Sequence, residues 1–231
     1  MIGNSRLHWA LFKEEKLQKS WDTEHIKKAE IENNENNTTP LILASVVPSQ
    51  TALWQTYQNV RIITLEQIPL KALYPTLGID RALAVWGAIA VWGDPMLVID
   101  AGTALTFTGA DNGQLIGGAI LPGLGLQLKS LTQGTANLPK IALPSQIPPR
   151  WALNTPAAIQ SGVVHAVVAV VRDFILDWWR LFPLSQVVFT GGDRTLLITY
   201  LQTQFPEIAA RLTADPHLVF WGMRSLLTGT P

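Results

Sequence analysis

The chain has 231 residues, of which 48% are hydrophobic, and its 17 basic and 17 acidic side chains give a formal net charge of zero. This balance excludes a general electrostatic attraction to nucleic acid, anionic membranes or acidic partners, and it favours a small-molecule role. There is no cysteine and the four histidines lack close ligand-like spacing, so disulfides are excluded and structural zinc is not expected.

The first residues give no sign of export. Arg6 and His8 lie close to Met1, and the basic region and apolar core of a signal peptide are missing. No apolar run reaches the length needed to cross a bilayer. The sequence therefore predicts a cytoplasmic protein without a membrane segment.

The first third of the chain alternates short apolar stretches with polar ones. Leu7–Phe12 is apolar and is followed by a strongly polar region, whose end at Asn33–Pro40 is predicted to be an exposed connection. Two β-branched segments, Leu41–Val47 and Val60–Thr64, enclose Pro48–Asn59, which has the length of one helix. This pattern indicates a βαβ unit.

A helix packed on a sheet is predicted from the turn Gly78-Ile79-Asp80 to Trp92, because apolar residues recur there at helical spacing. Gly93-Asp94-Pro95 ends this helix, and glycine-punctuated strands follow. The predicted strands are Met96–Ile99, Ala104–Thr108 and Leu115–Ile120. We therefore predict two domains, at residues 1–94 and 95–231.

The second domain is predicted to contain a long buried helix at Pro156–Phe182, where apolar residues recur in steps of three and four. Val187–Thr190 is the last clear strand, and it ends in Gly191-Gly192-Asp193. Strands and helices thus alternate in both halves, which indicates an α/β fold.

Three turns combine small residues with a polar side chain. Glycine lets backbone N–H groups approach a ligand, and phosphate is the expected guest. The turns are Gly3-Asn4-Ser5, Asp100-Ala101-Gly102-Thr103 and Thr190-Gly191-Gly192-Asp193. Singly each is more often a plain strand connection, but their order is a stronger signal.

Other nucleotide and hydrolase motifs are missing. The chain has no Gly-x-x-x-x-Gly-Lys-Ser/Thr loop, no Gly-x-Gly-x-x-Gly turn between a strand and a helix, and no Gly-x-Ser-x-Gly elbow. Their absence argues against the P-loop, dinucleotide-binding and serine hydrolase classes.

Taken together, the three turns resemble the two phosphate loops and the adenosine loop of actin-like sugar and acetate kinases. Within that superfamily the chain resembles the type III pantothenate kinases, and matching segments occur in order over nearly the whole chain. They are Gly3–Arg6, Trp9–Leu11, Ser45–Pro48, Gly78–Arg81, Ile99–Thr106, Gly117–Gly123, Thr135–Pro139, Asn154–Gly162 and Thr190–Asp193.

The resemblance implies two ribonuclease-H-like lobes of α/β type with an active cleft between them, the last helix packing back on the first lobe. It also implies transfer of the terminal phosphate of ATP to the primary hydroxyl of pantothenate, which opens coenzyme A biosynthesis. Mg²⁺ and a monovalent cation, K⁺ or NH₄⁺, are implied as requirements. A homodimer is implied too, with the helix from Pro156 as an interface candidate and its burial inside one subunit as the alternative.

Phosphoryl transfer depends mainly on positioning and charge neutralisation, with a carboxylate that orients or deprotonates the attacking hydroxyl. By resemblance Asp80 is this base, whereas the residues alone favour a helix N-cap at Asp80. Arg81 becomes a substrate or phosphate contact instead of a solvated helix residue. Tyr74, together with Gly78-Ile79, completes the predicted substrate contacts near Asp80. Thr155 is predicted to contact pantothenate, or else to cap the helix that begins at Pro156.

The predicted ATP contacts are Gly3, Asn4, Ser5 and Arg6 in the first turn and Thr103 in the second. Asp100 is predicted to hold the monovalent cation, because a carboxylate beside backbone carbonyls suits a hard cation. Asp100 as a turn-stabilising residue and Thr103 as an ordinary strand residue are the alternatives.

The first turn departs from the family pattern. An Asp should stand two positions before Gly3, where this chain has Met1, and most of the first strand is missing. Because the loss of a central strand would leave its neighbours with unpaired backbone groups, we hypothesise that the natural start lies upstream.

Two other functions remain open at this point. A non-catalytic regulatory or ligand-binding relative is favoured by the missing Asp but opposed by Asp80, Arg81, Asp100 and Thr103. A kinase of a sugar or another small alcohol on the same fold is the second alternative.

Overall fold

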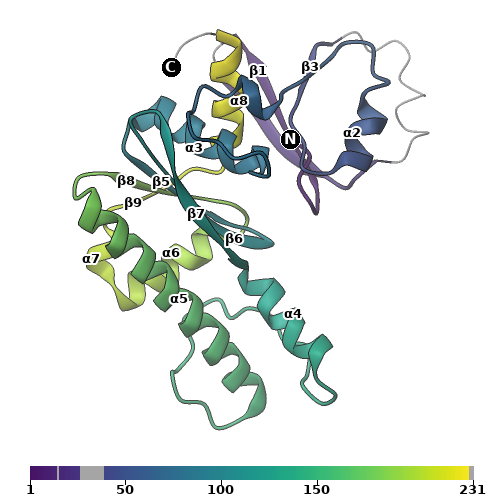
Figure 1. The fold of residues 1–231 in the computed structure, drawn as a ribbon. Coiled ribbons are helices and arrows are strands. Elements are labelled where there is room, and N and C mark those ends of the chain that lie inside the picture. Colours follow the sequence, from purple (N-terminus) through teal and green to yellow (C-terminus); the bar gives the residue numbers. More distant parts are fainter. Residues whose placement is uncertain (15, 27–38, 229–231) are drawn as a thin grey trace. The chain divides into compact units, whose positions relative to one another are not determined.

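The computed structural model describes residues 1–14, 16–26 and 39–228, so most of the predicted connection at Asn33–Pro40 lies outside the described residues. The chain divides into two compact units (Figure 1). One unit is formed by residues 1–91 with the chain from residue 218 onward, and the other by residues 92–217.

The first unit contains two small sheets. Strands β1 (Leu7–Lys13) and β2 (Lys16–Thr23) form an antiparallel hairpin. Strands β3 (Leu41–Leu43) and β4 (Val60–Ile62) are parallel and are connected through helix α2 (Pro48–Trp54), so the predicted βαβ unit is confirmed.

Ile2 connects these two sheets. It forms one bridge to Leu7 and another to Ser45, and its N–H donates to the Ala44 carbonyl at 2.8 Å. Its side chain is buried with Leu7, Leu43 and Trp54 in a small apolar cluster. The segment before the first turn is therefore held on both sides.

Two helices of this unit pack through glycine. A Cβ on Gly87 of α3 (Ile79–Trp92) would lie 2.0 Å from the Leu218 carbonyl oxygen in α8 (Leu218–Thr228). A Cβ on Gly222 of α8 would lie 2.2 Å from the Leu83 oxygen in α3. The two backbones are thus in direct contact, and this packing fixes α3 and with it the Gly78–Arg81 segment. A short 3₁₀ helix, η1 (Leu65–Gln67), precedes α3.

The second unit is built on a five-stranded sheet in the order β7-β6-β5-β8-β9. Its strands are β5 (Met96–Ala101), β6 (Ala104–Asp111), β7 (Gln114–Pro122), β8 (Gln186–Thr190) and β9 (Leu212–Ala214). The first three strands are antiparallel, whereas β8 and β9 run parallel to β5. Asp100 in β5 pairs with Thr190 in the parallel strand β8. The second and third predicted turns therefore follow the carboxyl ends of two neighbouring strands and lie at the same end of the sheet.

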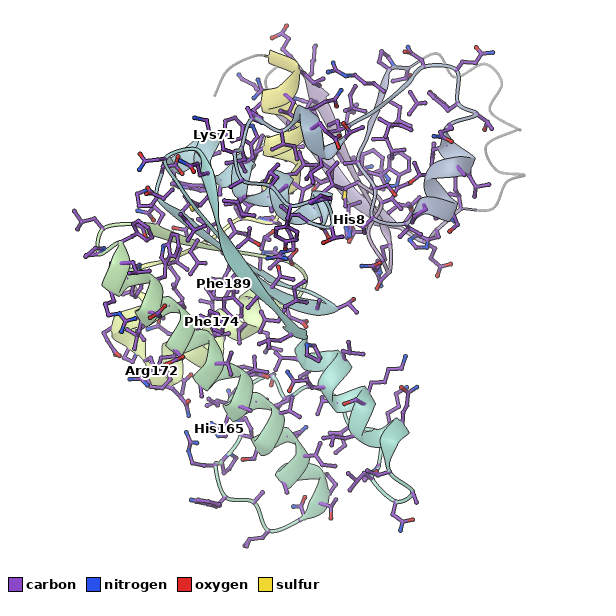
Figure 2. The ribbon with its side chains drawn as sticks, in the orientation of Figure 1. His8, Lys71, His165, Arg172, Phe174 and Phe189 are labelled. Atoms are coloured by element: carbon purple, nitrogen blue, oxygen red, sulfur yellow. The ribbon has the colours of Figure 1, made fainter. Side chains whose placement is uncertain are left out.

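Helix α5 (Thr155–Leu181) packs its valine-rich side on this sheet (Figure 1). Phe174 of α5 stacks on Phe107 of β6 with 4.2 Å between ring centroids, and Phe189 of β8 is buried in the same core (Figure 2). Among the described residues α5 is the one helix long and apolar enough to cross a membrane, but it is a core helix of this unit. The predicted burial of the long helix is confirmed.

The remaining elements of this unit are α4 (Leu124–Gly134), α6 (Arg194–Gln204) and α7 (Pro206–Ala209). The sequence predicted neither α4 nor β2. The eight residues of β2 are exposed or half-buried, so they lack the alternation that marks a half-buried strand. The start of α4 was not predicted because glycines flank Leu124 on both sides, and glycine is typical of turns.

Candidate functional site

The first predicted phosphate turn is a tight turn at the surface. The N–H of Gly3 donates to the Arg6 carbonyl at 3.0 Å, and His25 Nε2 lies 2.9 Å from the Gly3 carbonyl oxygen. The turn leaves Asn4, Ser5 and Arg6 exposed to solvent.

The Gly-Ile-Asp-Arg segment forms the start of α3. The Gly78 carbonyl accepts from the N–H groups of Arg81 and Ala82, so Asp80 lies inside the first helical turn and is not the N-cap. Asp80 Oδ1 accepts from the Arg81 N–H at 2.8 Å. A Cβ on Gly78 would lie 2.4 Å from this Oδ1, so the carboxylate occupies the space that only glycine leaves open.

Burial raises the pKa of Asp80 above its ordinary value, although the hydrogen bond from the Arg81 N–H and the charge of Arg81 act in the opposite direction. The Arg81 side chain is itself buried, and its Nη1 donates to the Tyr74 hydroxyl at 3.1 Å. Tyr74 is 41% exposed. The structure thus brings together Tyr74, Arg81 and Asp80 as a phenol, a guanidinium and a half-buried carboxylate.

The second predicted turn, Asp100–Thr103, is enclosed by backbone. A Cβ on Gly123 would lie 2.0 Å from the Gly102 oxygen and 2.8 Å from the Thr103 oxygen, and the Gly123 N–H donates to that Thr103 oxygen at 2.9 Å. The Thr103 side chain is exposed, and Asp100 is half-buried. The turn is therefore backed closely by Gly123, while Thr103 itself is exposed.

The third turn lies against the second. Gly191 has a positive φ of 87°, and a Cβ there would lie 2.4 Å from Asp100 Oδ1 and 2.5 Å from the Ala101 oxygen. The Asp193 N–H donates to the same Ala101 oxygen at 2.8 Å, and Arg194 Nη1 donates to the Gly191 carbonyl at 2.8 Å. Glycine is required at Gly191 for both conformation and space. Burial raises the pKa of Asp193.

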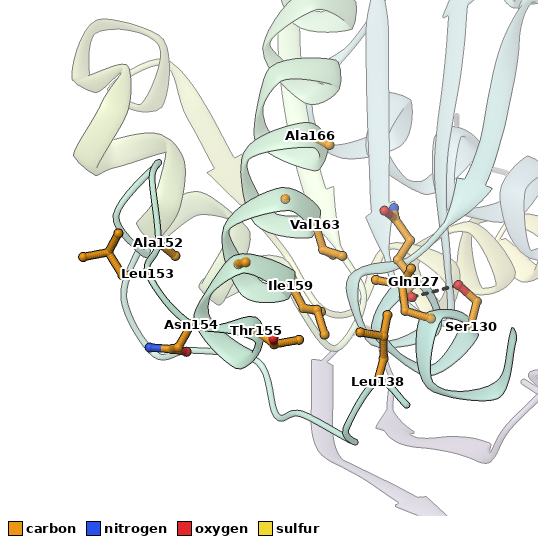
Figure 3. A pocket seen from close by; sticks show the side chains of 13 residues that line it. Gln127, Ser130, Leu138, Ala152, Leu153, Asn154, Thr155, Ile159, Val163 and Ala166 are labelled. Carbon is orange, nitrogen blue, oxygen red and sulfur yellow. Dashed lines mark hydrogen bonds between the residues drawn. The ribbon is translucent and has the colours of Figure 1, made fainter. Parts of the chain in front are cut away.

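Thr155 is the first residue of α5 but not its cap. Asn154 is the N-cap, and its side-chain oxygen accepts from the Ala157 N–H at 2.9 Å, so the alternative of Thr155 as a cap is wrong. Thr155 instead lines an open pocket of about 830 Å³ between α4 and α5. In Figure 3 Thr155, Ile159 and Val163 face this pocket from α5.

The other wall of the pocket could not be predicted from the sequence, because helix α4, which forms much of it, was not predicted. It includes Gln127 and Ser130 from α4 and Leu138 from the following loop (Figure 3). Most of the lining is apolar, with Gln127, Ser130, Asn154 and Thr155 as the polar side chains. A small, largely apolar ligand with a few hydrogen-bonding groups fits this chemistry.

The described residues contain no cluster of three His, Asp or Glu side chains that could hold a metal ion by themselves. A cation at Asp100 would need further oxygen ligands from backbone carbonyls, water or a bound phosphate group. The carbonyl-rich surroundings of Asp100 fit a hard cation better than zinc.

Comparison with known proteins agrees with the resemblance in the sequence. A family model described as type III pantothenate kinase matches residues 2–177. The type III pantothenate kinase of Nostoc sp. is 52% identical, over 99% of this chain and 93% of its own length. That of Synechocystis sp. is 46% identical, over 99% of this chain and 89% of its own length.

A solved structure shares the fold. The crystal structure of a conserved Baf family transcriptional activator from Campylobacter jejuni aligns with a TM-score of 0.71 over 100% of this chain and 96% of its own, at 22% sequence identity. At this identity the likeness concerns the fold alone. The mixed α/β, actin-like fold expected from the sequence is confirmed.

Proposed function

The chain belongs to the type III pantothenate kinase family, and from this premise we propose how its residues divide the work of phosphorylating pantothenate with ATP. The activity is that of a phosphotransferase with an alcohol acceptor, EC 2.7.1.33. Curated relatives at 46–52% identity favour this kinase over a non-catalytic protein on the same fold. As expected for an enzyme of coenzyme A biosynthesis, we place it in the cytoplasm.

Asp80 acts as the base. Its carboxylate takes the proton from the primary hydroxyl of pantothenate while the hydroxyl oxygen bonds to the γ-phosphorus and ADP leaves with the broken bond's electrons. The observation that carries this role is the half-buried carboxylate with a raised pKa, because a base of higher proton affinity accepts a proton more readily. Its place in the first turn of α3 puts it near the positive end of the helix dipole, which favours the charged carboxylate and thus opposes the effect of burial on the pKa.

Arg81 neutralises negative charge beside this base. Its guanidinium is buried and donates to Tyr74, so it is held in one orientation. A guanidinium fixed in this way suits a carboxylate or a phosphate, and both reactants carry one of these groups. Tyr74, which is partly exposed, adds a hydroxyl to the substrate side, and Gly78-Ile79 give the close backbone approach.

The phosphates of ATP bind at the Asp100–Thr103 turn, with Gly3, Asn4, Ser5 and Arg6 as a second set of contacts. Thr103 is an exposed residue on a turn that backbone contacts hold in place, which supports contact with a phosphate oxygen. Asp100 contributes the carboxylate for K⁺ or NH₄⁺, and Mg²⁺ is bound chiefly through the ATP phosphates. When bound, these cations neutralise the charge that develops on the phosphoryl oxygens.

Thr155 hydrogen-bonds pantothenate in the pocket between α4 and α5. The mixed lining suits a molecule with amide and hydroxyl groups on an aliphatic chain. The active protein is a homodimer, and the exposed apolar Trp151 and Leu153, 88% and 104% exposed beside this pocket, support a subunit contact in the region.

The test is turnover with pantothenate by Asp80→Asn beside Asp94→Asn. The first variant keeps the shape of the side chain but cannot take a proton, so we expect a loss of about 10²–10⁴-fold in kcat at an unchanged Tm. The control changes an exposed carboxylate that accepts from the Gly113 N–H, and we expect it to match the parent chain.

Full turnover by Asp80→Asn would remove Asp80 as the base. No turnover by the parent chain, with or without K⁺, would favour the non-catalytic reading, and turnover with a different alcohol alone would favour another kinase.

A further inference from the structure

The loop between α4 and α5 contains no helix or strand. In residues 139–153, referred to below as the α4–α5 loop, four positions are proline and therefore lack a backbone N–H donor. The loop leads directly into Asn154 and Thr155, and Ala152 and Leu153 at its end line the pocket. Whatever holds this loop also sets the position of one pocket wall.

Side chains from the neighbouring helices hold the loop through its carbonyl groups. Gln160 Nε2 of α5 donates to the Ala142 oxygen at 2.9 Å, and Ser161 Oγ donates to the Arg150 oxygen at 2.6 Å. The Tyr200 hydroxyl of α6 donates to the Pro144 oxygen.

His165 adds a bond at the centre of this set. Its Nε2 lies 2.9 Å from the Pro148 oxygen, and because a carbonyl can only accept, Nε2 carries the proton. In the neutral ring Nδ1 is then the acceptor, and it lies 3.1 Å from the side-chain amide nitrogen of Gln204 on α6. His165 thus connects α6, α5 and the loop, and Figure 2 shows it in the part of α5 beside the loop.

Ser161 and His165 are unusual in α5, because they are the buried polar residues of an otherwise apolar helix core. They are 5% and 8% exposed. A buried polar side chain is destabilising unless it is hydrogen-bonded, and here each one is satisfied by a loop carbonyl. Neither side chain lines the pocket.

We propose that Ser161 and His165 are positioning residues for pantothenate, which act by fixing the α4–α5 loop and so the part of the pocket wall that Ala152 and Leu153 form next to Thr155. This inference rests on the proposed assignment of the pocket to pantothenate. If Ser161 and His165 position the loop in this way, loosening the loop weakens the binding of pantothenate and leaves the chemical step and ATP binding intact. A purely structural role for the two residues would lower stability without this selectivity.

The experiment compares Ser161→Ala and His165→Leu with Ser185→Ala in the full chain. Ser185 is also a buried serine with one side-chain hydrogen bond, from Trp178 Nε1, but it lies at the other end of α5. For the first two variants we expect the KM for pantothenate to rise about five- to tenfold, as for one lost hydrogen bond, with kcat and the KM for ATP within about twofold of the parent. His165→Gln, which retains a donor, should restore the KM, and Ser185→Ala should change Tm alone.

A readout without substrate follows the loop itself. Trypsin can cut after Arg150 only when the loop opens locally, since the Arg150 carbonyl accepts from Ser161. Below Tm, cleavage after Arg150 should accelerate in Ser161→Ala and His165→Leu but not in Ser185→Ala. Unchanged cleavage, or faster cleavage with an unchanged KM for pantothenate, would overturn the proposal.

Thr155→Val separates this proposal from the pocket assignment. If Thr155→Val leaves the KM for pantothenate unchanged while Ser161→Ala raises it, the role of Thr155 fails and the positioning role stands through Ala152 and Leu153 at the end of the loop. If Thr155→Val raises the KM and Ser161→Ala does not, the pocket assignment stands and the positioning role fails.

Discussion

The turns at Gly3–Arg6 and Asp100–Thr103 are both predicted to contact ATP, but they have different surroundings. The first is an exposed turn closed by one internal hydrogen bond, from the Gly3 N–H to the Arg6 carbonyl. The second is backed by Gly123 and Gly191, each at a distance that would bring a Cβ to 2.4 Å or less from it. A phosphate site gains from groups that are already in place before the ligand binds, so the second turn is the better organised of the two.

The largest expected effect comes from filling the space behind the second turn. Gly123→Ala would place a Cβ 2.0 Å from the Gly102 carbonyl oxygen, which forces a backbone shift and costs about 3 kcal/mol or more. We expect a clearly lower Tm in thermal unfolding and no measurable kinase turnover.

Two further glycine substitutions serve as controls for Gly123→Ala, one in the first turn and one in α4. Gly3→Ala in the first turn would meet His8 Nε2 at 3.2 Å, and a side chain can yield, so we expect a change of about 1 kcal/mol or less. Gly125→Ala in α4 meets nothing within 4 Å and should raise Tm slightly. A Gly3→Ala variant as damaged as Gly123→Ala would contradict the difference between the turns.

Removing the charge of the second turn should have the next largest effect. Asp100→Asn is expected to lower kcat/KM about ten- to a hundredfold, because contacts to a charged group contribute about 1.5–3 kcal/mol each. Stimulation by K⁺ should disappear with it in a potassium titration of the initial rate. Asn4→Ala in the first turn should keep the dependence on K⁺, and a K⁺-stimulated Asp100→Asn enzyme would show that the cation binds elsewhere.

The dependence of kinase activity on pH tests Asp80 on α3 separately from the two turns. Burial raises the pKa of Asp80, and the protonated carboxyl cannot act as a base. Activity should therefore be lost as the pH falls through a pKa above the ordinary value of about 3.9, with kcat/KM falling about tenfold for each pH unit below it. A profile that stays flat down to pH ~4 would argue against Asp80.

The features visible in the sequence are those that depend on local pattern. The periodic apolar residues predicted α3 and α5, and short apolar runs bounded by glycine predicted β5 and β8. Strand β2 could not be predicted, because all its residues but the half-buried Leu17 are exposed, and the strand is held by pairing with β1. The close approach of Gly123 to Gly102 is a contact between two separate segments of the folded chain, so no spacing in the sequence reveals it.

The same distinction applies to the site. Asp80, Asp100 and Thr103 could be named from motifs, since each motif is a continuous segment. The pocket at Thr155 could be recognised only with α4 in place, and the role of His165 depends on carbonyl groups of a loop without regular structure.

The most direct test of ATP binding at the second turn is the affinity for ATP, measured by calorimetry on Thr103→Val and Ser5→Ala, which remove one hydroxyl each from the second and the first turn. We expect a Kd about tenfold higher for Thr103→Val, as for the loss of one hydrogen bond to a charged phosphate, and a change of less than about threefold for Ser5→Ala. A loss of affinity in Ser5→Ala equal to or larger than that in Thr103→Val would contradict it.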